Sequence, residues 1–126
     1  MLNNPIGWFE IYVDNLMRAK CFYEAVLGVN LEHMDNPANP SIDMWGFPSN
    51  MEQYGATGAL VKMERDSARR NSTIVYFSCE DCGIEESRVV TVGGNIQQSK
   101  KSIGQYGFMS LVIDTEGNMF GLHSMK

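Results

Sequence analysis

The chain has 126 residues, 44% of them apolar, which is enough to bury the core of one globular domain. Its formal net charge of −5 argues against nucleic acid or an anionic membrane as a partner, because both repel an acidic surface. No apolar run approaches the roughly 18 residues that cross a bilayer, and the first residues, MLNNPIGWFE, lack the basic and apolar regions of a signal peptide. We therefore expect a cytoplasmic protein whose three cysteines are free thiols.

Residues 7–13, GWFEIYV, alternate between an apolar and a mixed set of side chains, which is typical of a strand with two different faces. The pair Asp14-Asn15 predicts a turn and a helix cap, and apolar residues then recur at helical spacing until Gly28. Strand-like segments follow near residues 30–34, 41–46 and 56–63. The first half of the chain therefore predicts the order β-α-β-β-β.

A charged segment without apolar periodicity follows, and we interpret residues 64–72 as a linker. The pattern then starts again with an offset of 66 residues, which aligns Asn15 with Asp81 and Gly28 with Gly94. Strand-like segments near residues 95–99, 106–113 and 119–123 complete a second β-α-β-β-β unit. We predict a single domain made of two modules, residues 6–63 and 73–126.

The sequence Cys79-Glu80-Asp81-Cys82 has the spacing of a metal site or a redox pair. The repeat aligns Cys79 with Val13 and Cys82 with Leu16, two positions that we expect in the apolar core. A zinc site would need two further Cys or His ligands nearby, which the sequence does not obviously offer. We interpret both cysteines as packing residues. One point stays open, because a thiol in the first turn of a helix is reactive if it is exposed.

The paired modules, the stretch FEIYVDNLMRAKCFYEAVLG (residues 9–28) and the closing DTEGNMFGLH (residues 114–123) resemble the vicinal oxygen chelate superfamily. This superfamily includes glyoxalase I, extradiol dioxygenases and bleomycin-resistance proteins. The resemblance covers nearly the whole chain and implies an α+β fold, in which two βαβββ modules form a half-open mixed β-barrel around a cleft. It also implies a homodimer. Because the fold hosts isomerases, dioxygenases and metal-free binding proteins, it does not by itself select a function.

Enzymes of this superfamily hold a divalent metal with His or Glu on the first and last strand of each module. Carried onto this chain, the first-strand positions are Trp8 and Ile74, and the last-strand positions are Gly121 and Gly58. None of these four residues binds a metal, so the resemblance implies no metal cofactor here. The Lewis-acid mechanism of the superfamily would need other ligands.

Other side chains with metal-binding groups are Glu10, Glu32, His33, Asp43, Glu116 and His123. Strand alternation places Glu10 and His123 on the side of the cleft and His33 at a strand edge. One carboxylate and one imidazole are fewer than the three protein ligands that a catalytic metal usually has. The remaining acids and His33 are interpreted as solvated surface.

Alternation also predicts which faces of the first strands pack on the helices, namely Phe9, Ile11 and Val13 in one module and Val75, Phe77 and Cys79 in the other. The opposite faces would line the cleft. The predicted ligand-binding residues are Trp8, Glu10, Tyr12, Met44, Ile74, Tyr76, Met109 and His123, with Ser78 beside them and Trp45 as the alternative to Met44. Aromatic side chains with a few polar groups describe a small-molecule pocket, although the same side chains would also fill a small barrel as core.

Glu10 favours the pocket, because an unpaired carboxylate in a dry core costs several kcal/mol. A carboxylate in such a cleft would also suit a general base, which makes Glu10 the candidate catalytic residue. The alternative is that Glu10 is paired with a tyrosine or a lysine for structure alone.

We therefore predict a metal-free protein of this fold that binds a small aromatic or amphipathic molecule in its cleft and forms a homodimer. One alternative is a glyoxalase- or dioxygenase-type enzyme whose metal site is rebuilt from Glu10, His123 and a partner chain. Another is an accessory protein that acts through its surface.

Overall fold

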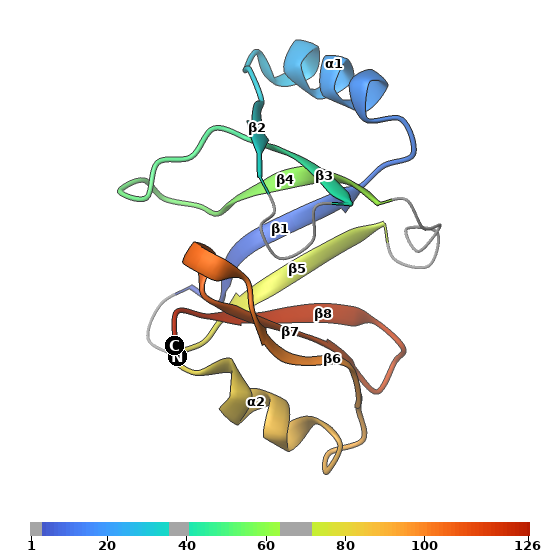
Figure 1. The fold of residues 1–126 in the computed structure, drawn as a ribbon, viewed down its shortest axis with the longest axis vertical. Helices are drawn as coiled ribbons and strands as arrows, with labels where there is room; N and C mark the ends of the chain where they lie inside the picture. The colour runs from blue at the N-terminus through green and yellow to red at the C-terminus, as the bar shows by residue number, and fades with distance from the viewer. Residues whose placement is uncertain (1–3, 36–40, 64–71) are drawn as a thin grey trace. The chain divides into compact units, whose positions relative to one another are not determined.

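A computed structural model describes residues 4–35, 41–63 and 72–126 (Figure 1). Most of the predicted linker lies outside the described residues. The elements, in chain order, are β1 (Ile6–Tyr12), α1 (Leu16–Leu27), β2 (Glu32–Met34), β3 (Ile42–Gly46), β4 (Thr57–Met63), β5 (Thr73–Ser78), α2 (Cys82–Val89), β6 (Asn95–Ser102), the 3-10 turn Gly104–Tyr106, β7 (Phe108–Ile113) and β8 (Met119–Ser124). The predicted order, β-α-β-β-β twice, is confirmed. Neither helix in these ranges is long and apolar enough to cross a membrane.

Contacts among the described residues divide the chain into two compact units. The N-terminal unit is Phe9–Thr73, and the C-terminal unit is Ile74–Lys126 together with Met1–Trp8. The first residues of β1 therefore belong to the C-terminal unit. That the two modules form one domain around a cleft stays a prediction.

The strands of the two units are arranged alike. In the N-terminal unit the order is β2-β3-β4-β1, with antiparallel pairing of β2 to β3 and of β3 to β4. In the C-terminal unit the order is β5-β8-β7-β6, with β5 and β8 parallel and the other pairs antiparallel. The edge strand β6 is exposed, carries two lysines and shifts register at Gln98. Lysines and irregular pairing at an edge discourage the addition of another strand.

Helix α1 begins and ends where the sequence predicts. The Asn15 side chain accepts a hydrogen bond from the backbone N–H of Arg18 at 3.0 Å, and Gly28 ends the helix at a φ of 66°, which glycine adopts without strain. The core beneath α1 consists of Leu16, Leu31 and Leu60, with Ile11, Val13, Ala19, Tyr23, Val29, Trp45 and Phe47 packed against it. The predicted packing of Ile11 and Val13 on the helix side is confirmed.

Helix α2 is capped as predicted but ends early. Asp81 accepts a hydrogen bond from the backbone N–H of Gly83 at 2.9 Å. The alignment with α1 predicts a helix up to residue 93, whereas α2 ends at Val89. Residues 89–92, VVTV, are all β-branched, and such side chains are restricted against the preceding helical turn. The chain turns instead, with Gly93 at a φ of 104°.

The core beneath α2 consists of Cys82, Val112 and Leu122, with Phe77, Cys79, Val89, Phe108 and Phe120 packed against it. The predicted helix-side packing of Phe77 and Cys79 is confirmed. The prediction for Val75 is wrong, because its side chain is 37% exposed. We attribute this to the early end of α2, which leaves the start of β5 uncovered.

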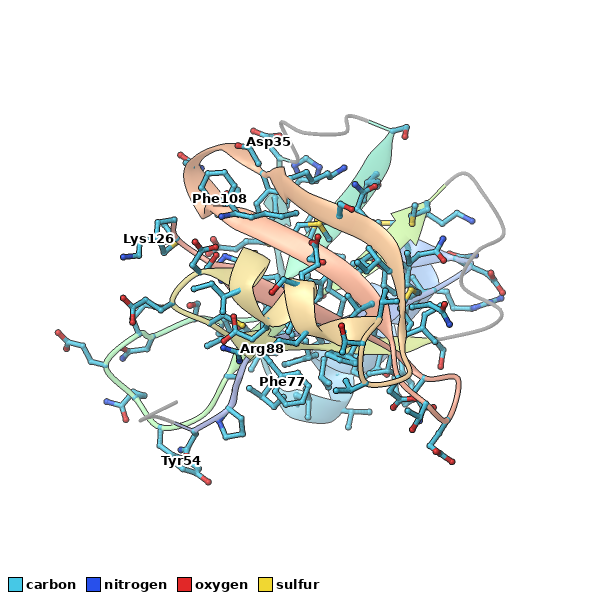
Figure 2. All side chains as sticks on the ribbon, turned by 90° about the horizontal axis from the view of Figure 1, so that it is seen from below. Asp35, Tyr54, Phe77, Arg88, Phe108 and Lys126 are labelled. Carbon is cyan, nitrogen blue, oxygen red and sulfur yellow. The ribbon has the colours of Figure 1, made fainter. Side chains whose placement is uncertain are left out.

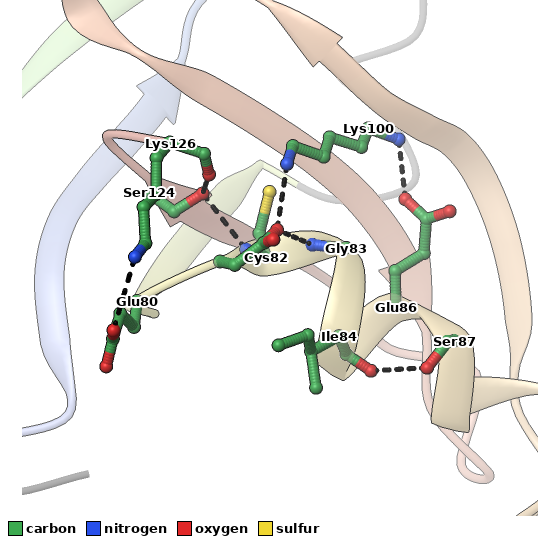
Figure 3. A network of polar contacts seen from close by, with 10 residues as sticks. Glu80, Cys82, Gly83, Ile84, Glu86, Ser87, Lys100, Ser124 and Lys126 are labelled. Atoms are coloured by element: carbon green, nitrogen blue, oxygen red, sulfur yellow. Dashed lines mark hydrogen bonds and ion pairs between the residues drawn. The ribbon is translucent and has the colours of Figure 1, made fainter.

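A polar network fixes the N-terminus of α2 (Figure 3). The Ser124 hydroxyl accepts a hydrogen bond from the backbone N–H of Cys82 at 3.0 Å. Lys100 Nζ lies 2.8 Å from Asp81 Oδ1, and the backbone N–H of Lys100 donates to the Glu86 carboxylate. The hydrogen bond from Lys100 holds the pKa of Asp81 below its usual value. These contacts tie β6 and β8 to α2.

Candidate ligand-binding site

One row of side chains crosses four strands of the C-terminal unit on the side away from α2. Strand pairing places Lys101 of β6 beside Met109 of β7, and Met109 beside His123 of β8. His123 in turn lies beside Ser78 of β5. The residues next to them on β5, β7 and β8 pack under α2, so this row points the other way. The row contains Met109 and His123, which the sequence predicts, and adds Lys101.

His123 is held by the main chain. Its Nε2 lies 2.6 Å from the carbonyl oxygen of Tyr106. Because a carbonyl only accepts, Nε2 carries a proton and donates, and in the neutral ring Nδ1 then has the free lone pair. The half-buried ring therefore offers an acceptor nitrogen to a ligand. Sequence reasoning missed Tyr106, because only its backbone takes part and no side-chain pattern signals such a contact.

The ring of Tyr76 fills the space above Gly121. These two residues lie on β5 and β8, two positions before Ser78 and His123. The two residues are paired across β5 and β8, and a β-carbon built on Gly121 would collide with the Tyr76 ring. Tyr76 and Ile74 are both buried, with exposed fractions of 6% and 2%. Gly121 is therefore covered by an aromatic ring, and no larger side chain fits there without movement.

In the N-terminal unit, Glu10 and Tyr12 form a hydrogen-bonded pair. The Tyr12 hydroxyl donates to Glu10 Oε1 at 2.8 Å, and the Glu10 side chain is buried. Burial and the nearby Glu10 carboxylate raise the pKa of Tyr12 well above its usual value. The sequence left two roles open for Glu10, a general base or a structural partner of a tyrosine or lysine. The structure contains the pairing with a tyrosine. Of the two residues weighed on β3, Met44 is buried opposite Val61, whereas Trp45 packs in the core beneath α1.

In each module, the residue after the first strand donates a backbone hydrogen bond to the last strand, and these two bonds show which residues of the last strands are equivalent. The backbone N–H of Val13 donates to the carbonyl of Val61 at 3.0 Å, and that of Cys79 donates to the carbonyl of His123 at 2.7 Å. Cys79 follows Val13 by 66 residues, but His123 follows Val61 by only 62. Between these two points the second module is therefore four residues shorter than the first.

This change of offset corrects one aligned position. With Val61 equivalent to His123, the partner of Gly121 in the first module is Ala59 and not Gly58. A β-carbon on Gly58 would instead collide with Phe9, whose ring lies 5.6 Å from that of Phe47 in the packing beneath α1. Gly58 thus belongs to the helix side of its sheet.

Trp8 is half buried in β1. Close to it, the backbone N–H of Ser78 donates to the carbonyl of Pro5 at 2.9 Å. A β-carbon on Gly7 would collide with the Ser78 hydroxyl, so the start of β1 passes close to Ser78. The role of Trp8 in binding stays a prediction.

The two neighbouring cysteines are packing residues, as predicted. Cys82 is fully buried in the core beneath α2, and Cys79 packs at its margin. Burial, followed by the nearby Glu85 carboxylate, raises the pKa of the Cys79 thiol to about 11. Cys79 is therefore a protonated, weakly nucleophilic thiol at neutral pH.

His33 lies on β2, at the edge of its sheet, as predicted. Its Nε2 is 3.3 Å from Asp43 Oδ1 and its Nδ1 is 3.8 Å from Asp35 Oδ1, and all three side chains are exposed. Within residues 4–35, 41–63 and 72–126, no three His, Cys, Asp or Glu side chains are grouped to hold a metal ion.

The sequence matches no protein-family description and no curated protein, whereas solved structures match over nearly its whole length. A variant of Streptomyces coelicolor methylmalonyl-CoA epimerase in complex with 2-nitronate-propionyl-CoA has a TM-score of 0.72 at 13% identity, covering 96% of both chains. Methylmalonyl-CoA epimerase from Mycobacterium tuberculosis has a TM-score of 0.70 at 14% identity, covering 100% of this chain and 93% of that one. A hypothetical protein from Bacillus halodurans C-125 has a TM-score of 0.72 at 10% identity, covering 96% and 94%.

Methylmalonyl-CoA epimerases are members of the vicinal oxygen chelate superfamily. This chain has the vicinal oxygen chelate fold. The predicted α+β fold class is thereby confirmed. At these identities the likeness shows the fold alone, and it carries no residue roles from one protein to the other.

The residues of this chain do not fit the divalent metal of vicinal oxygen chelate enzymes. Of the positions aligned with their ligands, Ile74 and Ala59 are buried apolar residues and Gly121 lies under the Tyr76 ring. The two replacements that we considered are engaged within the chain, since Glu10 accepts from Tyr12 and His123 donates to a main-chain carbonyl.

Proposed function

We propose that this protein binds a small amphipathic molecule without a metal ion, on the side of the C-terminal unit away from α2. The observation that carries the proposal is the row Lys101, Met109, His123 and Ser78. It combines a cation, an imidazole with an acceptor nitrogen, a hydroxyl and a thioether. Small-molecule sites are mostly apolar, with a few polar groups that orient the ligand.

The chemistry of the row suggests the class of ligand. Lys101 is exposed and favours an acidic group on the ligand. Met109 is buried, with an exposed fraction of 9%, and its flexible side chain suits a flat aromatic or an aliphatic part. The complex of the S. coelicolor epimerase with a CoA ester analogue supports an amphipathic, acidic ligand as suitable for this fold. We also include Trp8 in the proposed site, where its indole ring would stack on an aromatic part of the ligand.

The proposal includes the biological setting expected from the sequence. With a net charge of −5, the protein would act in the cytoplasm on a small molecule and have no nucleic-acid or membrane partner. It would do so as a homodimer. In this account Glu10 supports the fold through Tyr12, and it is not assigned a catalytic role.

Thermal-shift measurements with matched ligand pairs test this function. Aromatic carboxylates such as phenylacetate should raise the melting temperature more than their uncharged amides, because only the acid meets the charge of Lys101. The Lys101→Ala variant should lose this difference, and His123→Ala should weaken binding of both members of a pair.

Lys100→Ala is the matched control. It removes the same charge from the adjacent position, but the Lys100 side chain lies on the other side of β6, against Asp81 and the ring of Phe108. The preference for the carboxylate should survive in this variant. If no carboxylate stabilises the wild-type protein, or if both lysine variants behave alike, the proposed function is wrong.

A further inference from the structure

The outer face of α1 is apolar, although a helix on a protein surface normally turns a polar face to water. The residues on this face, all of them exposed, are Met17, Arg18, Cys21, Phe22, Ala25 and Val26. Three of them, Met17, Phe22 and Val26, have exposed fractions of 52%, 60% and 62%. Figure 1 shows the strands of the N-terminal unit on one side of α1 and no described element of that unit on its outer side.

The second helix provides an internal comparison. With the offset of 66 residues, Cys21 corresponds to Ser87 and Phe22 corresponds to Arg88. Both α2 residues are exposed and polar, on a helix that packs on its sheet in the same way. The fold therefore does not require an apolar residue at these positions. Helix α2 does expose one large apolar side chain, Ile84, at the position of Arg18, but it is polar at the positions of Cys21 and Phe22.

The other large apolar side chains exposed in the described part of this unit, Leu27, Met51 and Tyr54, do not belong to this face. Tyr54, for example, projects from the loop between β3 and β4 with an exposed fraction of 95% (Figure 2). The face of α1 differs because five neighbouring apolar residues occupy three successive turns of one helix.

We propose that this face packs against the same face of a second copy of the chain, with the two α1 helices antiparallel across a two-fold axis. Such an isologous contact buries both apolar faces at once. The small side chains of Cys21 and Ala25 lie in the middle of the face and let the helices approach closely.

Charge complementarity selects a second copy in this orientation. Arg18 is the single charged residue of the face and lies in the first turn of α1, whereas the last turn contains no basic residue. An antiparallel pair places each Arg18 beside the last turn of the other helix, where the free carbonyl groups favour a cation. A parallel pair would instead bring the two arginines together.

The oligomeric state in solution, measured by light scattering coupled to size exclusion, tests this interface. The wild-type protein should be a dimer at micromolar concentration. The Cys21→Asp variant should be a monomer with unchanged circular dichroism, because the new charge would lie in the contact while position 21 is exposed in the single chain. The matched control Ser87→Asp, at the equivalent position of α2, should remain a dimer.

Variants of Arg18 test the orientation independently of the apolar contact. Arg18→Glu should weaken the dimer at least tenfold, since a carboxylate would face the negative end of the partner helix, whereas Arg18→Lys should keep most of the affinity. A monomeric wild type at high micromolar concentration overturns the proposal and leaves the face to another partner. A Cys21→Asp protein that stays dimeric also overturns it.

Discussion

The ring of Tyr76 covers the α-carbon of Gly121, its direct partner in the parallel pair of β5 and β8. The sequence resemblance to the vicinal oxygen chelate superfamily aligns this position with a metal ligand of its enzymes. Here an aromatic ring occupies the space that a ligand side chain would need. The relationship explains why a glycine at this position goes together with a tyrosine on the neighbouring strand.

This contact makes the effect of Gly121→Ala depend on Tyr76. The added methyl group would push against the ring, and overpacking of a core typically costs about 1–3 kcal/mol of unfolding free energy. In a Tyr76→Ala background the same substitution should cost almost nothing, because the ring is gone. Urea denaturation of the four proteins of this cycle measures the coupling. An equal cost in both backgrounds would show that the ring does not limit position 121.

The buried pair of Glu10 and Tyr12 predicts a loss of stability at high pH. The pKa of Tyr12 in the folded protein lies above its usual value of 10.0, so the folded state keeps this proton at a pH where the unfolded chain loses it. Tyr12 therefore makes its full contribution to the free energy of unfolding below the usual pKa. This contribution is lost as the pH rises above that value, because the folded state then binds more protons than the unfolded chain. The free energy of unfolding should therefore fall above about pH 10.

Tyr12→Phe should reduce this slope, and at neutral pH it should cost about 1–2 kcal/mol for the lost hydrogen bond to Glu10. The exposed Tyr54 supplies a matched control, since Tyr54→Phe should leave both the slope and the neutral stability unchanged. Denaturation series at several pH values between about 8 and 11 measure both effects. Identical slopes for wild type and Tyr12→Phe would contradict the assignment.

The packing of Cys79 and Cys82 predicts that neither thiol reacts in the native protein. Cys82 is fully buried, and the pKa of Cys79 near 11 leaves very little thiolate at neutral pH. Alkylation with iodoacetamide, followed by mass spectrometry, should modify both residues only after unfolding in urea. Replacing Cys79 by Ala and Cys82 by Ser should cost about 1–2 kcal/mol of stability. Rapid native alkylation at either site would mean that the pair is not simply packed.

Trp8 offers a fluorescence readout of ligand binding. The other tryptophan, Trp45, packs beneath α1 with Lys20 Nζ 5.0 Å from its ring, so Trp45→Phe leaves Trp8 as the single reporter. Addition of an aromatic carboxylate should change this emission. Trp8→Ala should weaken binding by about 1–3 kcal/mol, which is the scale of a lost stacking contact. Unchanged affinity in Trp8→Ala would remove this residue from the site.

Much of the fold could be predicted because local signals are repeated in the chain. The caps at Asn15 and Asp81, the αL glycine at position 28 and the apolar strand faces each have a local physical cause that sequence alone displays. The four β-branched residues at 89–92 indicate an early end of α2. The alignment with α1 instead suggested a second helix of the same length.

The site was harder to predict because it depends on register. The loss of four residues between the modules moved the partner of Gly121 from Gly58 to Ala59, and no local pattern marks such a deletion. Lys101 joins the row through its pairing with Met109, which follows irregular pairing at Gln98. The contact between His123 and the Tyr106 carbonyl involves main chain and leaves no trace in side-chain composition.

The central claim, binding without a divalent metal, is tested most directly by calorimetric titration of the chelator-treated protein with Zn²⁺, Ni²⁺ and Mn²⁺. We expect no stoichiometric binding to the wild type. Trp8→His should behave in the same way, because Ile74, Ala59 and Gly121 would still supply no ligand. Tight one-to-one binding by the wild type that is lost in Glu10→Gln or His123→Ala would contradict the account.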